Sequence, residues 1–118
     1  DAAINLATAP GATLGEMFGM IQRAYAESGF PNEWNLHHQG GPTGYATREA
    51  LATPGSPLPV LANQAFAWNP SIAGTKSEDT ILCGQSGIEF LTQPSKDWPT
   101  VEVERGGQVL QRPGILVV

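Results

Sequence analysis

Charged residues are scarce in this sequence. They make up 14% of its 118 residues, whereas about a quarter is usual for soluble domains, so another domain or subunit is expected to cover part of the surface. Positive charge is the scarcer kind: six Lys and Arg stand against eleven Asp and Glu, for a formal net charge of −5, and no basic stretch occurs. Because phosphate contacts dominate affinity for DNA and RNA, we predict no nucleic-acid partner.

Cysteine and long apolar runs are also lacking. The single Cys83 excludes an internal disulfide and favours a reducing compartment, which predicts a cytoplasmic location. Cys83 itself is expected to be a small buried strand residue. No apolar run approaches the ~20 residues that a membrane-spanning helix needs, so no membrane association is predicted. The chain opens with Asp1 and carries no signal peptide, which indicates a processed or truncated piece of a larger protein.

The residues that are present suffice for one folded domain over residues 1–118. Hydrophobic residues make up 41% of the chain, and a chain of this length buries roughly two thirds of its unfolded surface. Residues 1–9 are typical of the end of a helix. Between residues 14 and 25 the apolar residues recur at the spacing of one helical face. Thr13 and Glu16 form a capping-box pattern in front of it, which predicts a second helix.

Short segments of strand character follow, separated by Gly and Pro. The predicted strands are 34–39, 65–69, 80–83 and 88–91, and the last two are expected to form a hairpin around the turn 84–87. A final hairpin of 101–103 and 109–110 is predicted around Gly106-Gly107. Residues 51–59 contain three prolines and are expected to form an irregular loop. A long helix followed by antiparallel strands predicts an α+β fold, with the helix packed on an antiparallel sheet.

Three polar segments, 34–49, 68–72 and 76–81, are candidates for function. On a regular strand His37 and His38 point to opposite faces, so they cannot both bind one metal ion; alternatively, both are strand histidines held by backbone hydrogen bonds. Glu78 is expected just inside a strand that follows a turn at Gly74-Thr75, at a sheet rim where ligand-binding groups are often placed. It could equally be a solvated residue or a salt-bridge partner, and Arg48 has the same alternative.

The order of three motifs carries a resemblance. HHQGGPTGYATRE (37–49), AFAWNP (65–70) and KSEDTIL (76–82) resemble the carboxyl-terminal half of the "pita-bread" fold. That fold belongs to the M24 family of metallopeptidases, which includes creatinase, aminopeptidase P, prolidase and methionine aminopeptidase. The resemblance extends from residue 1 to about residue 92. It implies that residues 1–118 are the C-terminal portion of an M24 metallopeptidase-like domain.

The resemblance also implies which metal ligands are kept. Family peptidases hold two divalent ions (Mn, Co or Zn) through two aspartates, one histidine and two glutamates, and the ions share a water that becomes the nucleophile. Both aspartates would lie upstream of this chain. Gly41 stands at the histidine position and Asn69 at the first glutamate position, while Glu78 keeps the final one. Glycine has no ligand atom and a neutral amide is a poorer ligand, so we expect no metal cofactor and no peptidase activity in this chain alone.

The remaining implied roles concern substrate. His37 matches a family histidine that contacts substrate and stabilises the tetrahedral intermediate, and Arg48 stands at a second such histidine; His38 and Tyr45 are assigned to the same substrate-binding surface. Three functions stay open. The chain could be part of a peptidase-family parent acting on a small peptide or small molecule, or of a metal-free creatinase-like hydrolase with His37 as acid and base. It could also be a non-catalytic ligand- or protein-binding module. A homodimer is further predicted, formed through an exposed sheet edge or through an apolar face.

Overall fold

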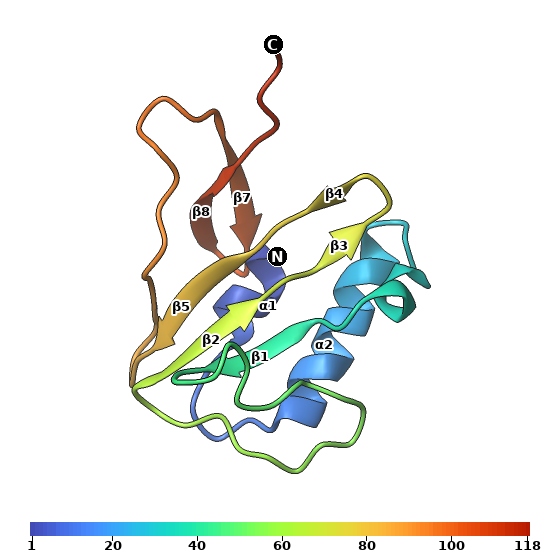
Figure 1. The fold of residues 1–118 in the computed structure, drawn as a ribbon, viewed down its shortest axis with the longest axis vertical. Coiled ribbons are helices and arrows are strands. Elements are labelled where there is room, and N and C mark those ends of the chain that lie inside the picture. The colour runs from blue at the N-terminus through green and yellow to red at the C-terminus, as the bar shows by residue number, and fades with distance from the viewer.

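The computed structural model describes residues 1–118 and confirms the predicted α+β fold, with helices packed on an antiparallel sheet (Figure 1). In chain order the elements are α1 (Ala2–Ala7), α2 (Leu14–Glu27), the 3-10 helix η1 (Glu33–Leu36), β1 (Gly40–Thr43), β2 (Gln64–Trp68), β3 (Ser71–Ile72), β4 (Thr75–Lys76), β5 (Asp79–Cys83), β6 (Ile88–Phe90), β7 (Thr100–Arg105) and β8 (Gln108–Pro113). No helix is long and apolar enough to cross a membrane.

Helix α2 begins where the capping box predicts. The Thr13 hydroxyl accepts a hydrogen bond from the Glu16 amide at 3.2 Å, and the Glu16 carboxylate accepts one from the Thr13 amide at 2.7 Å. Each satisfies a backbone N–H that the first helical turn would otherwise leave unpaired. The apolar face of the helix is buried from Leu14 to Tyr25, so sequence periodicity alone predicts both the helix and the side that packs on the sheet.

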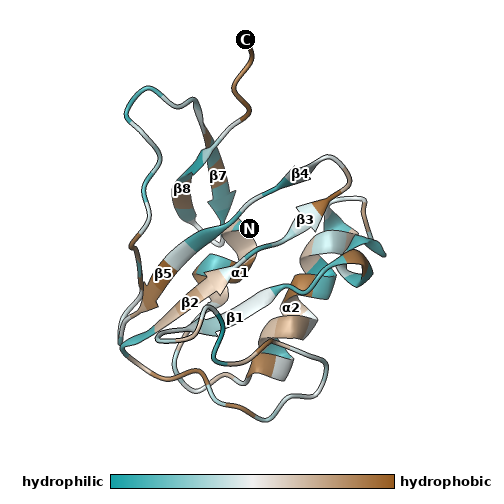
Figure 2. Cartoon of the chain, viewed as in Figure 1, coloured by the Kyte–Doolittle hydropathy of each residue, from teal (hydrophilic) through white to brown (hydrophobic).

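The main sheet has the strand order β1-β2-β5-β6, and every neighbouring pair is antiparallel. Phe66 on β2 lies opposite Ile81 on β5, and both are fully buried beneath the helices. Cys83 is also buried, as predicted. In Figure 2 the hydrophobic colour falls on α2 and on the end of β5, whereas β4 and the start of β5 are hydrophilic. The helices therefore cover one face of the sheet, and polar groups gather where β5 begins.

Two hairpins lie outside the main sheet. The β7–β8 hairpin forms around Gly106-Gly107 as predicted, and the hairpin of β5 with β6 is also confirmed. The β3–β4 hairpin was not predicted; it turns at Gly74, whose φ of +90° suits glycine. An isolated two-stranded hairpin is only marginally stable in water, so β7–β8 depends on its attachment to the rest of the chain.

The prediction of a strand over residues 34–39 was wrong. Residues 33–36 form η1, and the sheet begins only at Gly40. Local hydrogen bonds from side chains to the backbone explain the difference: the Trp34 indole donates to the Pro31 carbonyl at 2.9 Å, and the Gln39 amide donates to the His37 carbonyl at 2.7 Å. Such bonds compete with strand pairing and bend the chain before it enters the sheet.

Candidate functional site

Glu78 is the centre of a cluster of ion pairs. It lies one residue before β5, in the connection from β4, and not just inside a strand as predicted. Its carboxylate is 2.9 Å from Arg48 Nη2 and 3.0 Å from Lys76 Nζ. The hydrogen bonds from Lys76 and Arg48 lower the pKa of Glu78, although partial burial opposes them. Glu78 is therefore an ionised, doubly paired carboxylate at the rim of the sheet.

Arg48 reaches Glu78 from the loop that follows β1. Two backbone hydrogen bonds fasten this loop to the outer edge of β1: the Glu49 amide to the Pro42 carbonyl at 2.8 Å, and the Ala52 amide to the Gly40 carbonyl at 2.9 Å. The Arg48 side chain is only 12% exposed. Its Nη1 donates to the Thr47 carbonyl at 2.8 Å, whereas its buried Nε has no partner. The guanidinium is thus held beneath Glu78 by the loop.

The two histidines are neighbours, not residues on opposite faces. Their ring centroids are 4.4 Å apart, because the chain leaves η1 here and is not yet a regular strand. His37 Nδ1 lies 2.6 Å from the His38 carbonyl oxygen. A carbonyl can only accept, so Nδ1 carries a proton, and in the neutral form of the ring Nε2 has a free lone pair.

The charges of the ion-pair cluster change the pKa of His38. Although His38 is exposed, partial desolvation of its ring is the largest cause that lowers its pKa, and the positive charges of Arg48, Lys76 and protonated His37 lower it further. Glu78 is the one acidic group that raises it. The charges of the cluster are therefore close enough to act on His38, and their sum at that position is positive.

Gly41 and Asn69, the two positions at which the resemblance implied replaced ligands, are both enclosed by the fold. A Cβ added at Gly41 would lie 2.3 Å from the Ala50 carbonyl oxygen, so no side chain fits there. Asn69 is 2% exposed and its Oδ1 has no hydrogen-bond partner. Trp68 is paired with Asp79, so Asn69 and Glu78 lie at the same end of β2 and β5. No three His, Cys, Asp or Glu side chains gather as a metal-binding group in the 118 residues, and the residues present do not fit a dinuclear metal site.

Four of the predicted site residues thus lie near one another: His37, His38, Arg48 and Glu78. The Tyr45 side chain is fully exposed on the loop after β1, so no packing within the chain holds it against the other four. Sequence reasoning missed Lys76. A signal for it was present, since residues two apart in an extended segment point to the same side, and Lys76 precedes Glu78 by two.

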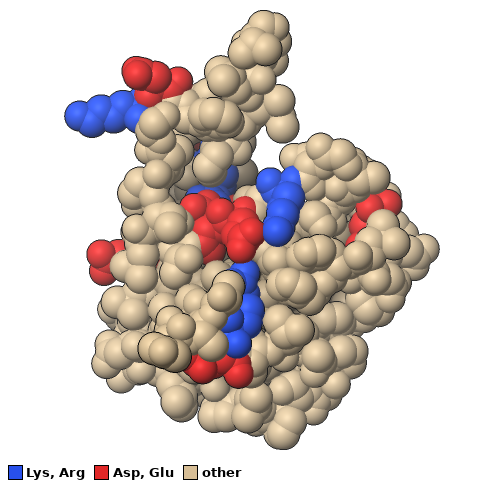
Figure 3. Space-filling model, in the orientation of Figure 1, with Lys and Arg blue, Asp and Glu red and all other residues tan.

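Asp79 points away from Glu78 and belongs to a second charged group. Arg112 on β8 is 5% exposed and pairs with the carboxylates of Asp79 and Asp1, and its guanidinium lies 4.5 Å from the centre of the Phe90 ring. The Thr92 hydroxyl donates to Asp79 at 2.5 Å. Figure 3 shows acidic and basic side chains gathered across the middle of this face, below the β7–β8 hairpin. No local pattern in the sequence predicts this long-range pairing.

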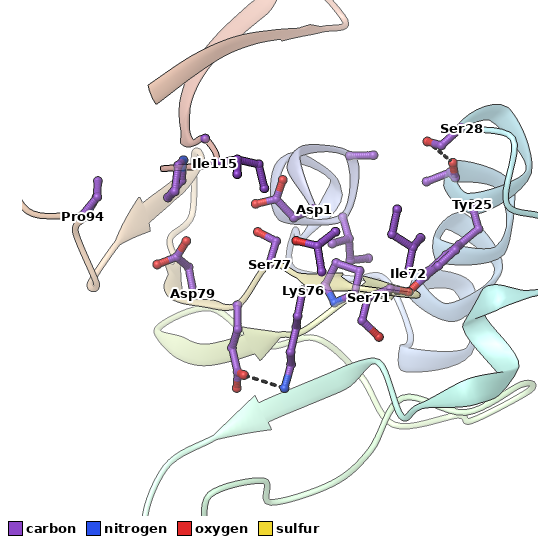
Figure 4. Close-up of a pocket in the computed structure, with 18 of the residues that line it drawn as sticks. Asp1, Tyr25, Ser28, Ser71, Ile72, Lys76, Ser77, Asp79, Pro94 and Ile115 are labelled. Carbon is purple, nitrogen blue, oxygen red and sulfur yellow. Dashed lines mark hydrogen bonds and ion pairs between the residues drawn. The ribbon is translucent and has the colours of Figure 1, made fainter. Parts of the chain in front are cut away.

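A groove of about 830 Å³ lies on the other side of β4. Its walls are α1, α2, the β3–β4 hairpin with residues 77–79, and the segments 93–98 and 113–116. Tyr25 is one of its lining residues, and its hydroxyl donates to the Ser71 carbonyl at 2.8 Å and accepts from the Ser71 amide at 2.7 Å. Lys76 and Glu78 both line the groove, and the Lys76 ammonium points away from Asp1 and toward its ion pair (Figure 4). The ion-pair cluster therefore forms part of the rim of the groove.

Comparisons with known proteins show a likeness of fold. No family model and no curated protein matches the sequence. Among solved structures, the crystal structure of dipeptidase PepE from Mycobacterium ulcerans matches with a TM-score of 0.66 and 21% sequence identity. The match covers 79% of this chain and 26% of that chain, so the present chain spans about a quarter of the length of its structural neighbour. At this identity the likeness shows the fold alone.

Proposed function

We propose that residues 1–118 are the C-terminal portion of an M24 peptidase-like domain of the pita-bread type, related to Xaa-Pro aminopeptidases and dipeptidases. In this proposal the parent protein takes a small peptide or small molecule, and this chain supplies one wall of the site without a metal pair. The order of the three motifs supports the family, and the fold likeness to a dipeptidase is consistent with it.

The observation that carries the proposal is the double pairing of Glu78. Arg48 Nη2 and Lys76 Nζ lie 2.9 Å and 3.0 Å from the carboxylate that, in this proposal, corresponds to the last metal ligand of the family. Like charges repel strongly at such distances in a partly buried site. Both cations would therefore oppose a divalent ion at Glu78, and in this proposal the chain alone holds no metal pair and is not a peptidase.

Calorimetry with Mn²⁺, Co²⁺ and Zn²⁺ tests this proposal. We expect no stoichiometric binding to the chain, and Glu78→Gln should change nothing in the titration. Glu104→Gln, an exposed position on β7, is the matched control for loss of a carboxylate. Binding of two ions per chain that disappears in Glu78→Gln but persists in Glu104→Gln would show that the metal site survives, and would end the proposal.

A metal-free hydrolase is the second candidate, because of the His37 tautomer. Its Nδ1 is held by the His38 carbonyl, so Nε2 is free to accept a proton from a water or substrate. Turnover of amide or amidine substrates that follows the ionisation of His37 and is lost in His37→Ala would favour it. A pH–rate profile that is unchanged in His37→Ala would rule out the metal-free hydrolase. Absence of any turnover would favour the third alternative, a non-catalytic ligand-binding module.

The homodimer and the cytoplasmic location stay predictions. The loop 49–52 already covers the outer edge of β1 through its backbone hydrogen bonds, whereas β6 is the outermost strand at the other edge of the sheet. We therefore propose that dimerisation, if it uses a sheet edge, uses β6.

A further inference from the structure

We infer that the cluster around Glu78 is a binding site for a carboxylate group, with Lys76 and His38 as the contacts and Arg48 as the charge beneath them. The inference rests on the proposed function and deepens it, because it names the group of the small peptide or small molecule that this wall recognises. The ligand is a monoanion: a free carboxylate on an amino acid, peptide or other small molecule.

The charges of the cluster favour an anion. Arg48 and Lys76 are two cations against the single carboxylate of Glu78, which leaves one positive charge in a chain whose formal net charge is −5. Glu49 is adjacent in sequence, but its carboxylate accepts from the Ala46 amide at 3.0 Å. The two cations therefore outweigh the acid, by one charge.

The accessible surface of the cluster also fits. The Lys76 side chain is 43% exposed. Its aliphatic stem is flexible, so its ammonium can move from Glu78 to a ligand. His38 is exposed and presents a ring that can donate a hydrogen bond. The Arg48 side chain is 12% exposed and stays paired below Glu78. A surplus of one charge suits a carboxylate better than a phosphate, which carries more charge than the cluster can balance.

Two matched ligands test the inference by NMR titration of the chain. N-acetylglycine carries a carboxylate, and N-acetylglycinamide is the same molecule without the charge. We expect the acid to shift the signals of His38 and Lys76 saturably and the amide to leave them unchanged. Inorganic phosphate serves as the third probe and should bind more weakly than the acid.

Substitutions give opposite signs for a carboxylate site and a metal site. Lys76→Gln should weaken N-acetylglycine about two- to fivefold, the size expected for a partly exposed charge pair. Glu78→Gln should strengthen it by a similar factor, because it frees both cations, whereas it would weaken any metal. Lys96→Gln and Glu104→Gln, both at exposed positions outside the cluster, are the controls and should leave the affinity unchanged.

Two results would overturn the inference: equal shifts from the acid and the amide, or weaker binding of the acid in Glu78→Gln. An absence of saturable shifts with all three probes would overturn it as well. These failures are distinct from failure of the proposed function, which the metal titration decides separately. A chain that binds no metal and does not distinguish acid from amide keeps the proposed function and loses only the carboxylate site.

Discussion

Arg112 should be the most costly charged residue to remove. Its guanidinium is 5% exposed between Asp79 and Asp1, whose side chains are 11% and 14% exposed, and it lies over the Phe90 ring. Arg112→Met keeps much of the apolar stem but leaves two poorly hydrated carboxylates without their cation. Breaking a buried ion pair by removing one partner costs about 3–5 kcal/mol. Because the pair also attaches β8 to the start of β5, we expect the hairpin to loosen in the same variant.

Arg105 on the same hairpin provides the control. It pairs with Glu27 of α2 at 3.1 Å, but the two side chains are 40% and 60% exposed. Arg105→Met should therefore cost only about 0–1 kcal/mol. With an unfolding entropy of about 2.1 cal/mol/K per residue, the Arg112 variant should lose about 12–20 °C in Tm and the Arg105 variant a few degrees at most.

Urea and thermal unfolding, followed by circular dichroism, measure the difference. Arg112→Lys should lose less than Arg112→Met, because one cation remains although the two-pronged pairing is lost. Equal destabilisation by Arg112→Met and Arg105→Met would refute the reasoning, since it would mean that burial of the Arg112 pairs contributes nothing.

Two further predictions concern the site. Gly41→Ala should lower the free energy of unfolding by about 1–3 kcal/mol, because the new Cβ would lie 2.3 Å from the Ala50 carbonyl oxygen. Gly19→Ala on α2 is the contrasting variant: its Cβ has room, so it should raise the free energy of unfolding by about 0.5–1 kcal/mol. Urea unfolding measures both. Burial and nearby cations lower the pKa of His38, so the unfolded chain binds its proton more readily and stability should fall as the pH drops below about 6.5. His38→Gln should remove that part of the slope below about pH 6.5; an unchanged slope would contradict it.

Local signals in the sequence predicted most of the fold. The capping box at Thr13 and Glu16 and the apolar periodicity fix α2 within a few residues, because both depend only on residues three or four apart. Gly106-Gly107 likewise predicts the turn of the last hairpin. The strand prediction for residues 34–39 failed because side chains of this segment donate hydrogen bonds to nearby backbone carbonyls. These bonds compete with strand pairing, and a pattern of alternating residues does not reveal them.

The site was less predictable, because its partners are distant in sequence. Arg48 and Glu78 are thirty positions apart, and Arg112 and Asp79 are thirty-three apart. The family resemblance predicted that His37, His38, Arg48 and Glu78 would lie on one surface. Which cation pairs with which acid is visible only in the folded chain.

Gly41, the loop after β1 and the ion pair of Glu78 depend on one another. Glycine at position 41 leaves room for the Ala50 carbonyl, so the loop after β1 can lie against that strand. The same loop carries Arg48 to within 2.9 Å of Glu78. A side chain at position 41 would therefore displace the loop and, with it, the Arg48 cation. Under the proposed relation to metallopeptidases, histidine at position 41 alone would push the loop away, and glutamate in place of Asn69 alone would put a second acid at the end of the sheet where Glu78 lies. A metal site of the proposed kind would need the loop, the glycine and the asparagine to change together.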